Sequence, residues 1–114
     1  MPIPELPNNI GRKRWLIGIQ GDRRPFTVLD EIHHVPANNA EKAIYLQKLQ
    51  FGDSKEPELR LGYYMIGKKP GRTKGRWVWA QFAPMISAKD FRAIIQKAEK
   101  KGWIWDHVTH LTRR

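Results

Sequence analysis

Residues 60–82 read RLGYYMIGKKPGRTKGRWVWAQF and contain two strand-like runs on either side of a basic loop. Apolar and aromatic side chains recur at every second position in residues 59–67 and again in residues 76–86, and this period of two is typical of β-strands. Between the runs, Pro70 and two glycines mark a turn. The stretch therefore predicts an antiparallel β-hairpin closed by a loop at residues 68–76.

The predicted loop carries five cations in nine residues and no acid: Lys68, Lys69, Arg72, Lys74 and Arg76. Cations at this density neutralise phosphates, and arginine can also form paired hydrogen bonds to a guanine edge, whereas lysine acts as a point charge. Hairpins are also kept basic to prevent edge-to-edge aggregation. We favour nucleic-acid binding because five cations without an acid are more than the prevention of aggregation requires.

Two tryptophans follow the loop on one face of the second strand. Trp77 and Trp79 alternate with Val78, Ala80 and Phe82, and the apolar character of the latter three predicts that they face the core. The tryptophans would then point outward beside the cations, as a platform on which unpaired bases stack. Burial of the strand on both faces is the alternative, and it stays open.

The composition favours one folded domain. The chain has 114 residues, 40% hydrophobic and 11% aromatic residues, and no cysteine, so disulfides, thiolate catalysis and cysteine-based zinc sites are excluded. No apolar window approaches the ~20 residues of a membrane span. The N-terminus lacks the basic and then apolar layout of a secretory signal, so we expect a cytoplasmic protein with no membrane partner.

The net charge of +10 is unevenly distributed. Residues 12–24 carry five cations and one acid, residues 25–59 three cations and six acids, and residues 60–76 six cations and no acid. Segregated charge of this kind is typical of a surface that faces a polyanion, although a solvated exterior would also be basic. We therefore expect a second basic contact, on the same sheet edge as the loop, formed by Arg12, Lys13, Arg14, Arg23 and Arg24.

The remaining segments predict an α+β fold. Residues 1–11 read as an extended, proline-rich arm, and residues 15–20 and 26–35 as a first antiparallel hairpin in which Phe26, Val28 and Ile32 share one side. Asn38 and Glu41 resemble a capping box before a helix at residues 40–50.

The second half of the chain repeats this pattern. Ser87 and Asp90 cap a further helix, with Ile86 and Phe91 as a hydrophobic staple and an apolar stripe through Ile94 and Ala98. The predicted order is β-β-α-β-β-α with an optional last strand at residues 103–105: an antiparallel sheet of four to five strands with two helices. The compact domain would span residues 12–106, followed by a tail at residues 107–114.

One segment combines acids and histidines. Asp30, Glu31, His33 and His34 lie on a predicted strand, but alternation places Asp30 and His34 on one face and Glu31 and His33 on the other. Asp-Glu-Ile-His-His followed by Asn38 and Asn39 resembles the opening of the HNH nuclease motif. That resemblance implies a histidine general base on a strand, a divalent metal, and a further metal ligand on the following helix. The chain departs from the motif because residues 40–50 contain no His or Asp.

The sequence thus predicts a small basic domain that binds nucleic acid through the loop, with DNA slightly favoured over RNA because a hairpin can enter a major groove. No cofactor is expected for such a binding module. Two alternatives stay open: a metal-dependent nuclease that uses the Asp-Glu-Ile-His-His segment, and a regulator that binds an acidic protein. Trp103 and Trp105 fit either core positions or a contact between the two copies of a homodimer.

Overall fold

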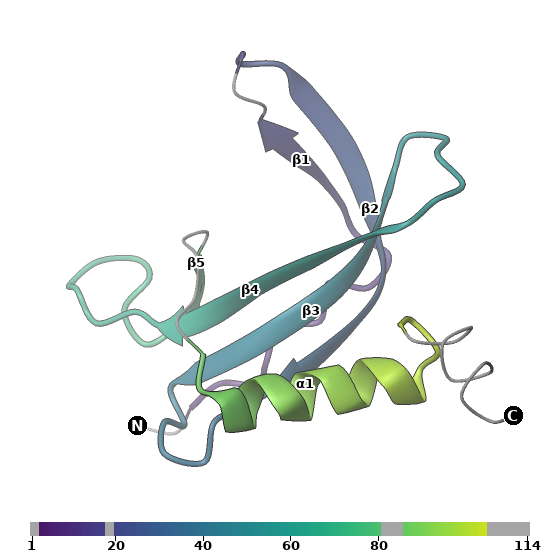
Figure 1. The fold of residues 1–114 in the computed structure, drawn as a ribbon. Helices are drawn as coiled ribbons and strands as arrows, with labels where there is room; N and C mark the ends of the chain where they lie inside the picture. The colour runs from purple at the N-terminus through teal and green to yellow at the C-terminus, as the bar shows by residue number, and fades with distance from the viewer. Residues whose placement is uncertain (1–2, 18–19, 81–85, 105–114) are drawn as a thin grey trace, which may run out of the picture.

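The computed structural model describes residues 3–17, 20–80 and 86–104. Five β-strands are followed by one α-helix (Figure 1). The elements are β1 (Lys13–Ile17), β2 (Arg23–His34), β3 (Lys42–Phe51), β4 (Glu58–Ile66), β5 (Trp77–Ala80) and α1 (Ala88–Lys100). Phe82, Trp105 and the tail expected at residues 107–114 lie outside the described residues.

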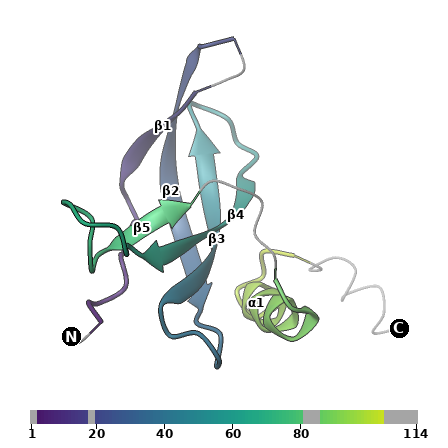
Figure 2. The same cartoon turned by 90° about the vertical axis from the view of Figure 1, so that its left-hand side faces the viewer.

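The five strands form one antiparallel sheet in sequence order, β1-β2-β3-β4-β5. The sheet is strongly curled, so that its two edge strands, β1 and β5, come to the same side of the molecule (Figure 2). We call the inner surface of the curl the concave face and the opposite surface, which carries α1, the helix face. The concave face is the one that matters for the candidate site.

The predicted helix at residues 40–50 is wrong, because this segment is β3, the central strand of the sheet. Ile44 and Leu46 are buried on the helix face, whereas Tyr45, Gln47 and Leu49 are buried on the concave face. A strand covered on both sides loses the alternation that identifies strands and reads as a continuous apolar run. The apolar residues of this segment therefore gave a pattern that also fits the buried face of a helix.

The predicted order β-β-α-β-β-α is consequently wrong, as is the second helix that it requires. The described residues contain a single helix, α1, after five strands. The optional strand was expected at residues 103–105. Its first two residues, Trp103 and Ile104, are not in a strand; they lie in the bend that follows α1 and pack against the core. The fold is mostly sheet, with one helix closing one face.

The helix α1 begins as its sequence predicts. The Ser87 hydroxyl accepts a hydrogen bond from the Asp90 amide at 3.1 Å and donates to the Asp90 carboxylate at 2.9 Å. Ile94 and Ala98 are fully buried against Ile32, Ile44 and Leu46 of the sheet. Phe91, expected in a hydrophobic staple, is 47% exposed. The main core therefore lies between α1 and the helix face of β2 and β3.

A bulge in β2 divides its apolar residues between the two faces. Val28 pairs with Leu49 and Asp30 with Lys48, so Leu29 is an extra residue in the ladder. As a result Phe26 and Val28 are buried on the concave face, whereas Ile32 is buried under α1. The prediction that Phe26, Val28 and Ile32 share one side of the strand is wrong for this reason.

The N-terminal segment, residues 3–11, is fixed to the sheet by polar contacts. The Trp77 indole donates to the Pro4 carbonyl at 2.9 Å, and the Tyr45 hydroxyl donates to the Pro7 carbonyl at 2.7 Å. Asn9 is buried and bonds to Glu31 and Tyr64. The segment thus covers one end of the concave face.

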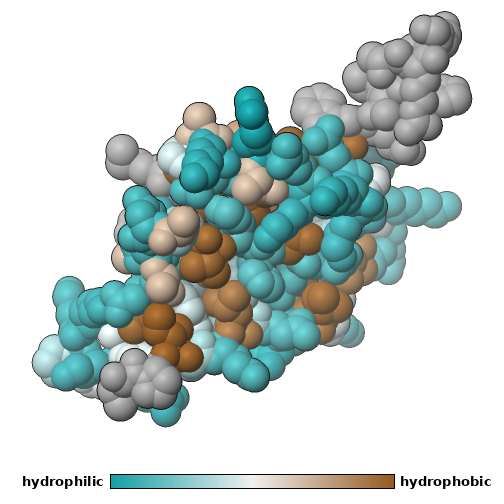
Figure 3. Space-filling view, turned by 90° about the horizontal axis from the view of Figure 1, so that it is seen from below, coloured by the Kyte–Doolittle hydropathy of each residue, from teal (hydrophilic) through white to brown (hydrophobic). Residues whose placement is uncertain are grey.

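Among the described residues, no helix has the length and apolar character needed to cross a bilayer. Viewed from below, the surface is mostly polar, and its apolar side chains form small separate groups (Figure 3).

Candidate nucleic-acid interface

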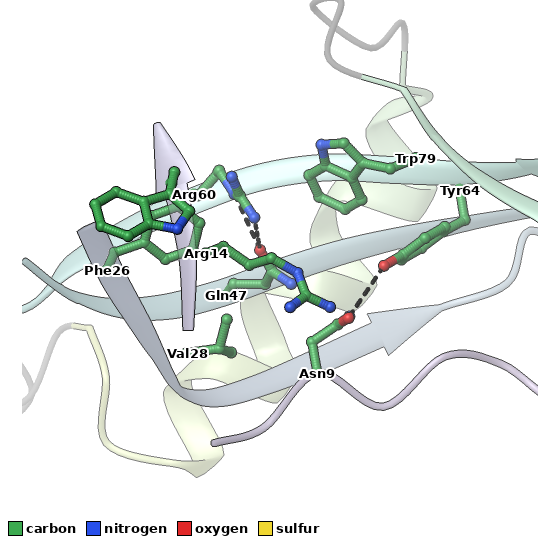
Figure 4. Close-up of a pocket in the computed structure, with 9 residues that line it drawn as sticks. Asn9, Arg14, Phe26, Val28, Gln47, Arg60, Tyr64 and Trp79 are labelled. Carbon is green, nitrogen blue, oxygen red and sulfur yellow. Dashed lines mark hydrogen bonds between the residues drawn. The ribbon is translucent and has the colours of Figure 1, made fainter. Parts of the chain in front are cut away.

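The concave face contains a groove lined by side chains from all parts of the sheet (Figure 4). One hollow of about 200 Å³ is bordered by Asn9 from the N-terminal segment and by side chains of β1 to β5. A second hollow of about 320 Å³ lies next to it, between β1 and β5. Trp15, Arg60 and Trp79 line both, so the two hollows form one groove, which we call the concave groove.

Arg60 lies at the centre of the concave groove and is held on several sides. Its guanidinium carbon is 4.9 Å from the centre of the Phe26 ring and 4.8 Å from that of Trp79. Its Nε and Nη2 both donate to the Gln47 side-chain oxygen, at 3.0 and 2.7 Å (Figure 4). Rings on both sides and a fixed acceptor restrict the guanidinium to one orientation.

Gln47 connects Arg60 to a carboxylate without bringing the two charges together. The Gln47 amide nitrogen donates to Glu31 at 2.9 Å, and Asn9 donates to both Glu31 oxygens through its backbone and side-chain nitrogens. Within the described residues no carboxylate forms an ion pair with Arg60. Partial burial lowers the pKa of Arg60, and Tyr64 and Glu31 oppose that effect. An arginine nevertheless stays charged at neutral pH.

Aromatic rings continue from the groove along the concave face. Trp79 meets Tyr64 edge to face at 5.0 Å, Tyr64 meets Tyr45 at 4.9 Å, and His33 stacks on Tyr45 at 5.3 Å. Burial raises the pKa of Tyr45 well above its ordinary value, and burial lowers the pKa of His33. This row fixes Trp79 from the side opposite Arg60 and makes one wall of the groove rigid.

The basic loop at residues 68–76 is closed by backbone hydrogen bonds. Gly67 donates to the Arg76 carbonyl and Gly75 donates to the Gly67 carbonyl, both at 2.9 Å. A side chain at Gly67 would come within 2.3 Å of the Thr73 carbonyl oxygen, so the turn needs a glycine there. Lys68 forms an ion pair with Glu41 at 2.6 Å. The other four cations, Lys69, Arg72, Lys74 and Arg76, are exposed and have no ion-pair partner among the described residues.

The second predicted basic contact, on β1 and β2, is only partly available. Arg23 lies over the Trp15 ring at 4.6 Å, and Arg24 lies over Phe51 at 4.3 Å and 3.9 Å from Glu58. Arg12, Lys13 and Arg14 are exposed at the start of β1, and Arg14 also lines the concave groove. Within the part of the chain that the structure describes, Arg12, Lys13 and Arg14 thus form no ion pair and no cation–π contact.

The two basic turns do not lie at one end of the sheet. Arg24 contacts Glu58, where β4 begins, whereas the loop at residues 68–76 follows Ile66, where β4 ends (Figure 1). Nine residues of strand separate these points, which is roughly 30 Å at ~3.3 Å per residue. The concave groove lies between them.

The tryptophans differ from their predicted placement. Trp77 and Trp79 are half-buried on the concave face, and Val78, expected in the core, is 36% exposed. Trp77 is engaged by the N-terminal segment, and Trp79 lies against Gly62 of β4. Of the tryptophans that the structure describes, the strongly exposed one is Trp15, at 56%, which the sequence indicated only as a strand residue.

Six further residues that line the first hollow were not predicted as site residues: Asn9, Phe26, Val28, Gln47, Arg60 and Tyr64. Arg60 stood in the basic stretch, but it belongs to the strand and not to the loop. No local signal indicates that it lies beside Trp79, because that contact depends on the register of β4 and β5. Gly62 was the one available clue, since a glycine inside a strand often marks the close approach of another group.

The four residues of the nuclease hypothesis are not brought together. Asp30 and His34 lie on the helix face, where Asp30 pairs with Lys101 and His34 with Asp90, both at 2.9 Å. Glu31 and His33 lie on the concave face, where Glu31 is bonded to Asn9 and Gln47. Among the described residues no group of three or more acids, histidines and cysteines could hold a metal. The helix that an HNH motif would place after the histidines is strand β3.

Comparison with known proteins found no counterpart: no family model, no curated protein and no solved structure matches this chain.

Proposed function

We propose that this protein binds nucleic acid and that the basic loop at residues 68–76 provides its main phosphate contacts. The observation that carries the proposal is the group of four exposed cations, Lys69, Arg72, Lys74 and Arg76, without an acidic partner among the described residues. A protein that only needed solubility would intersperse both signs of charge. Unneutralised cations on a closed turn are instead placed to displace counterions from a phosphate backbone.

The position of the loop supports the same function. The turn protrudes from the end of β4 and β5 and is fixed by its own hydrogen bonds, so its cations are held together at little cost in conformational freedom on binding (Figure 1). Lys13 and Arg14 lie on β1, an edge strand of the same sheet, and Arg12 directly precedes it. A polyanion that crosses the concave face would meet both groups.

A salt titration with matched variants tests the proposal. Fluorescence anisotropy measures the affinity for labelled single- and double-stranded DNA and RNA between about 50 and 200 mM salt. The slope of log K against log salt concentration is about −0.9 per neutralised phosphate on duplex DNA and about −0.7 on single strands. A triple loop variant, Lys69→Ala, Arg72→Ala and Arg76→Ala, should reduce the steepness of this dependence by about two to three phosphate equivalents.

A helix variant with the same loss of three charges is the control. Lys89→Ala, Arg92→Ala and Lys100→Ala change exposed positions on α1, on the face opposite the groove. We expect this variant to keep most of the wild-type salt dependence. The proposal is wrong if no nucleic acid binds, or if both variants lose affinity equally, because binding would then follow overall charge and not the loop.

A further inference from the structure

The concave groove presents hydrogen-bond donors and almost no free acceptors. Both oxygens of Glu31 accept from Asn9 and one also accepts from Gln47. The Gln47 oxygen accepts twice from Arg60, and the Asn9 oxygen accepts from the Tyr64 hydroxyl at 3.3 Å. Among the described residues, the acceptor oxygens of these side chains are thus already engaged. A ligand that fits must itself supply acceptors.

The charged donors of the groove belong to two arginines. Gln47 occupies the Nε and Nη2 side of the Arg60 guanidinium, which leaves its Nη1 and Nη2 edge. Nη1 has no hydrogen-bond partner among the described residues, and none of their buried side-chain nitrogens or oxygens lacks a partner, so Nη1 is not fully buried. Arg14 extends into the same groove from β1 (Figure 4). The groove therefore offers a fixed pair of donors on Arg60 and a second cation beside it.

The geometry points to a base as the ligand. We propose that the concave groove binds an unpaired guanine of a single-stranded nucleic acid, with the free edge of Arg60 bonded to guanine O6 and N7. Guanine presents two neighbouring acceptors on that edge, which match a guanidinium. Adenine and cytosine place an amino donor there, which would face the N–H donors of Arg60 and not an acceptor.

The depth of Arg60 explains why the base must be unpaired. Phe26 and Trp79 flank the guanidinium, and Asn9, Trp15 and Tyr64 border the hollow. An arginine that reads duplex DNA projects into the major groove, whereas this one is recessed between edge strands. A base would have to leave its helix to reach it, which is unfavourable in a duplex and costs little in a single strand. The aromatic walls would then contact the face of the base.

The dimensions of the groove agree with this ligand. Hollows of about 200 and 320 Å³ that share three residues make a site within the range of about 300–1,000 Å³ typical of small-molecule pockets. Arg14 and the neighbouring Arg12 and Lys13 are placed to contact the phosphates next to the bound base. This inference depends on the proposed function, since the loop supplies the affinity and the groove the selectivity.

Base analogues in the unaltered protein test the inference. Oligothymidylates of about 12 nucleotides, long enough to reach from one basic turn to the other, carry one central guanine, inosine, 7-deazaguanine or adenine. We expect guanine and inosine, which share O6 and N7, to bind about tenfold more tightly than adenine, and 7-deazaguanine, which lacks N7, to lose most of that advantage. A parallel ribonucleotide series distinguishes DNA from RNA.

Two variants separate the groove from the loop. Arg60→Lys keeps the charge but loses the paired donors, so it should abolish the guanine preference while the salt dependence stays close to wild type. The triple loop variant should weaken all oligonucleotides and keep the preference. Equal binding of all four bases by a protein that still binds in a salt-dependent way overturns the groove inference alone. Failure to bind any nucleic acid overturns the proposed function as well.

Discussion

The contact between Gly62 and Trp79 allows a sharp prediction about the rigidity of the concave groove. A Cβ atom added at Gly62 would lie 2.4 Å from both Cη2 and Cζ2 of the Trp79 ring. Carbon atoms in contact are normally 3.5–4.0 Å apart, so Gly62→Ala requires the indole to move by about 1 Å or more. Tyr64 and Arg60 hold the ring at 5.0 and 4.8 Å, which leaves little room for such a shift.

Two opposing effects set the expected magnitude. Alanine is favoured over glycine in a strand by about 0.5–1 kcal/mol, and Gly62 has no positive φ angle that would penalise a side chain. Overpacking a well-filled site costs about 1–3 kcal/mol. The steric term is larger, so Gly62→Ala should lower the free energy of unfolding by about 1–2 kcal/mol.

Urea denaturation followed by far-ultraviolet circular dichroism measures this change, and the double variant Gly62→Ala with Trp79→Leu identifies its cause. Removing the indole should make the alanine neutral or stabilising, so the two substitutions should couple by at least about 1 kcal/mol. If Gly62→Ala alone is as stable as wild type, or if its cost persists without the indole, Trp79 does not lie against Gly62 as described.

Three further outcomes are expected. Hydrogen bonds from His34 and Ser87 lower the pKa of Asp90 below its ordinary value of 3.8. The stability that the ionised carboxylate contributes is therefore present above pH 3.8 and is lost as the pH falls through the pKa of the folded state. In an acid titration Asp90→Asn should lose less of its unfolding free energy than the wild type. In a urea titration Ile94→Ala should lower the free energy of unfolding by about 2–5 kcal/mol, because the Ile94 side chain is 1% exposed. Phe91, which is 47% exposed, should lose under about 1 kcal/mol on substitution by alanine. Equal losses in the two variants would contradict the described orientation of α1. Oligonucleotides of about 5 residues should bind much more weakly than those of about 12 in anisotropy titrations, since the basic turns are roughly 30 Å apart; similar affinities would mean that only one turn is used.

The local elements that alternate in exposure could be predicted from the sequence. The run at residues 59–67 covers all of β4 except Glu58, the run at residues 76–86 contains β5, and Ser87 with Asp90 marks the start of α1. Each signal depends on neighbours a few residues away. The central strand could not be recognised, because β3 has α1 on one face and the groove residues on the other and so shows no polar side.

The candidate site was predictable only where it is local. The loop cations lie within nine consecutive residues, and all five are exposed. The groove brings together Asn9, Trp15, Phe26, Arg60 and Trp79 from five different segments. Their meeting depends on the curl of the sheet and on the bulge at Leu29, which reverses the facing of every later residue in β2. Neither feature has a marker in these residues.

The sequential order of the sheet has a consequence for how the chain folds. Every strand pairs with the strand that precedes or follows it, so each hairpin can close before the next is complete, and such local topologies fold quickly. The bonds from Trp77 to Pro4 and from Tyr64 to Asn9 span 73 and 55 residues. These contacts close the concave face and cannot form until β4 and β5 have joined the sheet. The groove should therefore be the last part of the molecule to acquire its native shape, after the sheet that supports it.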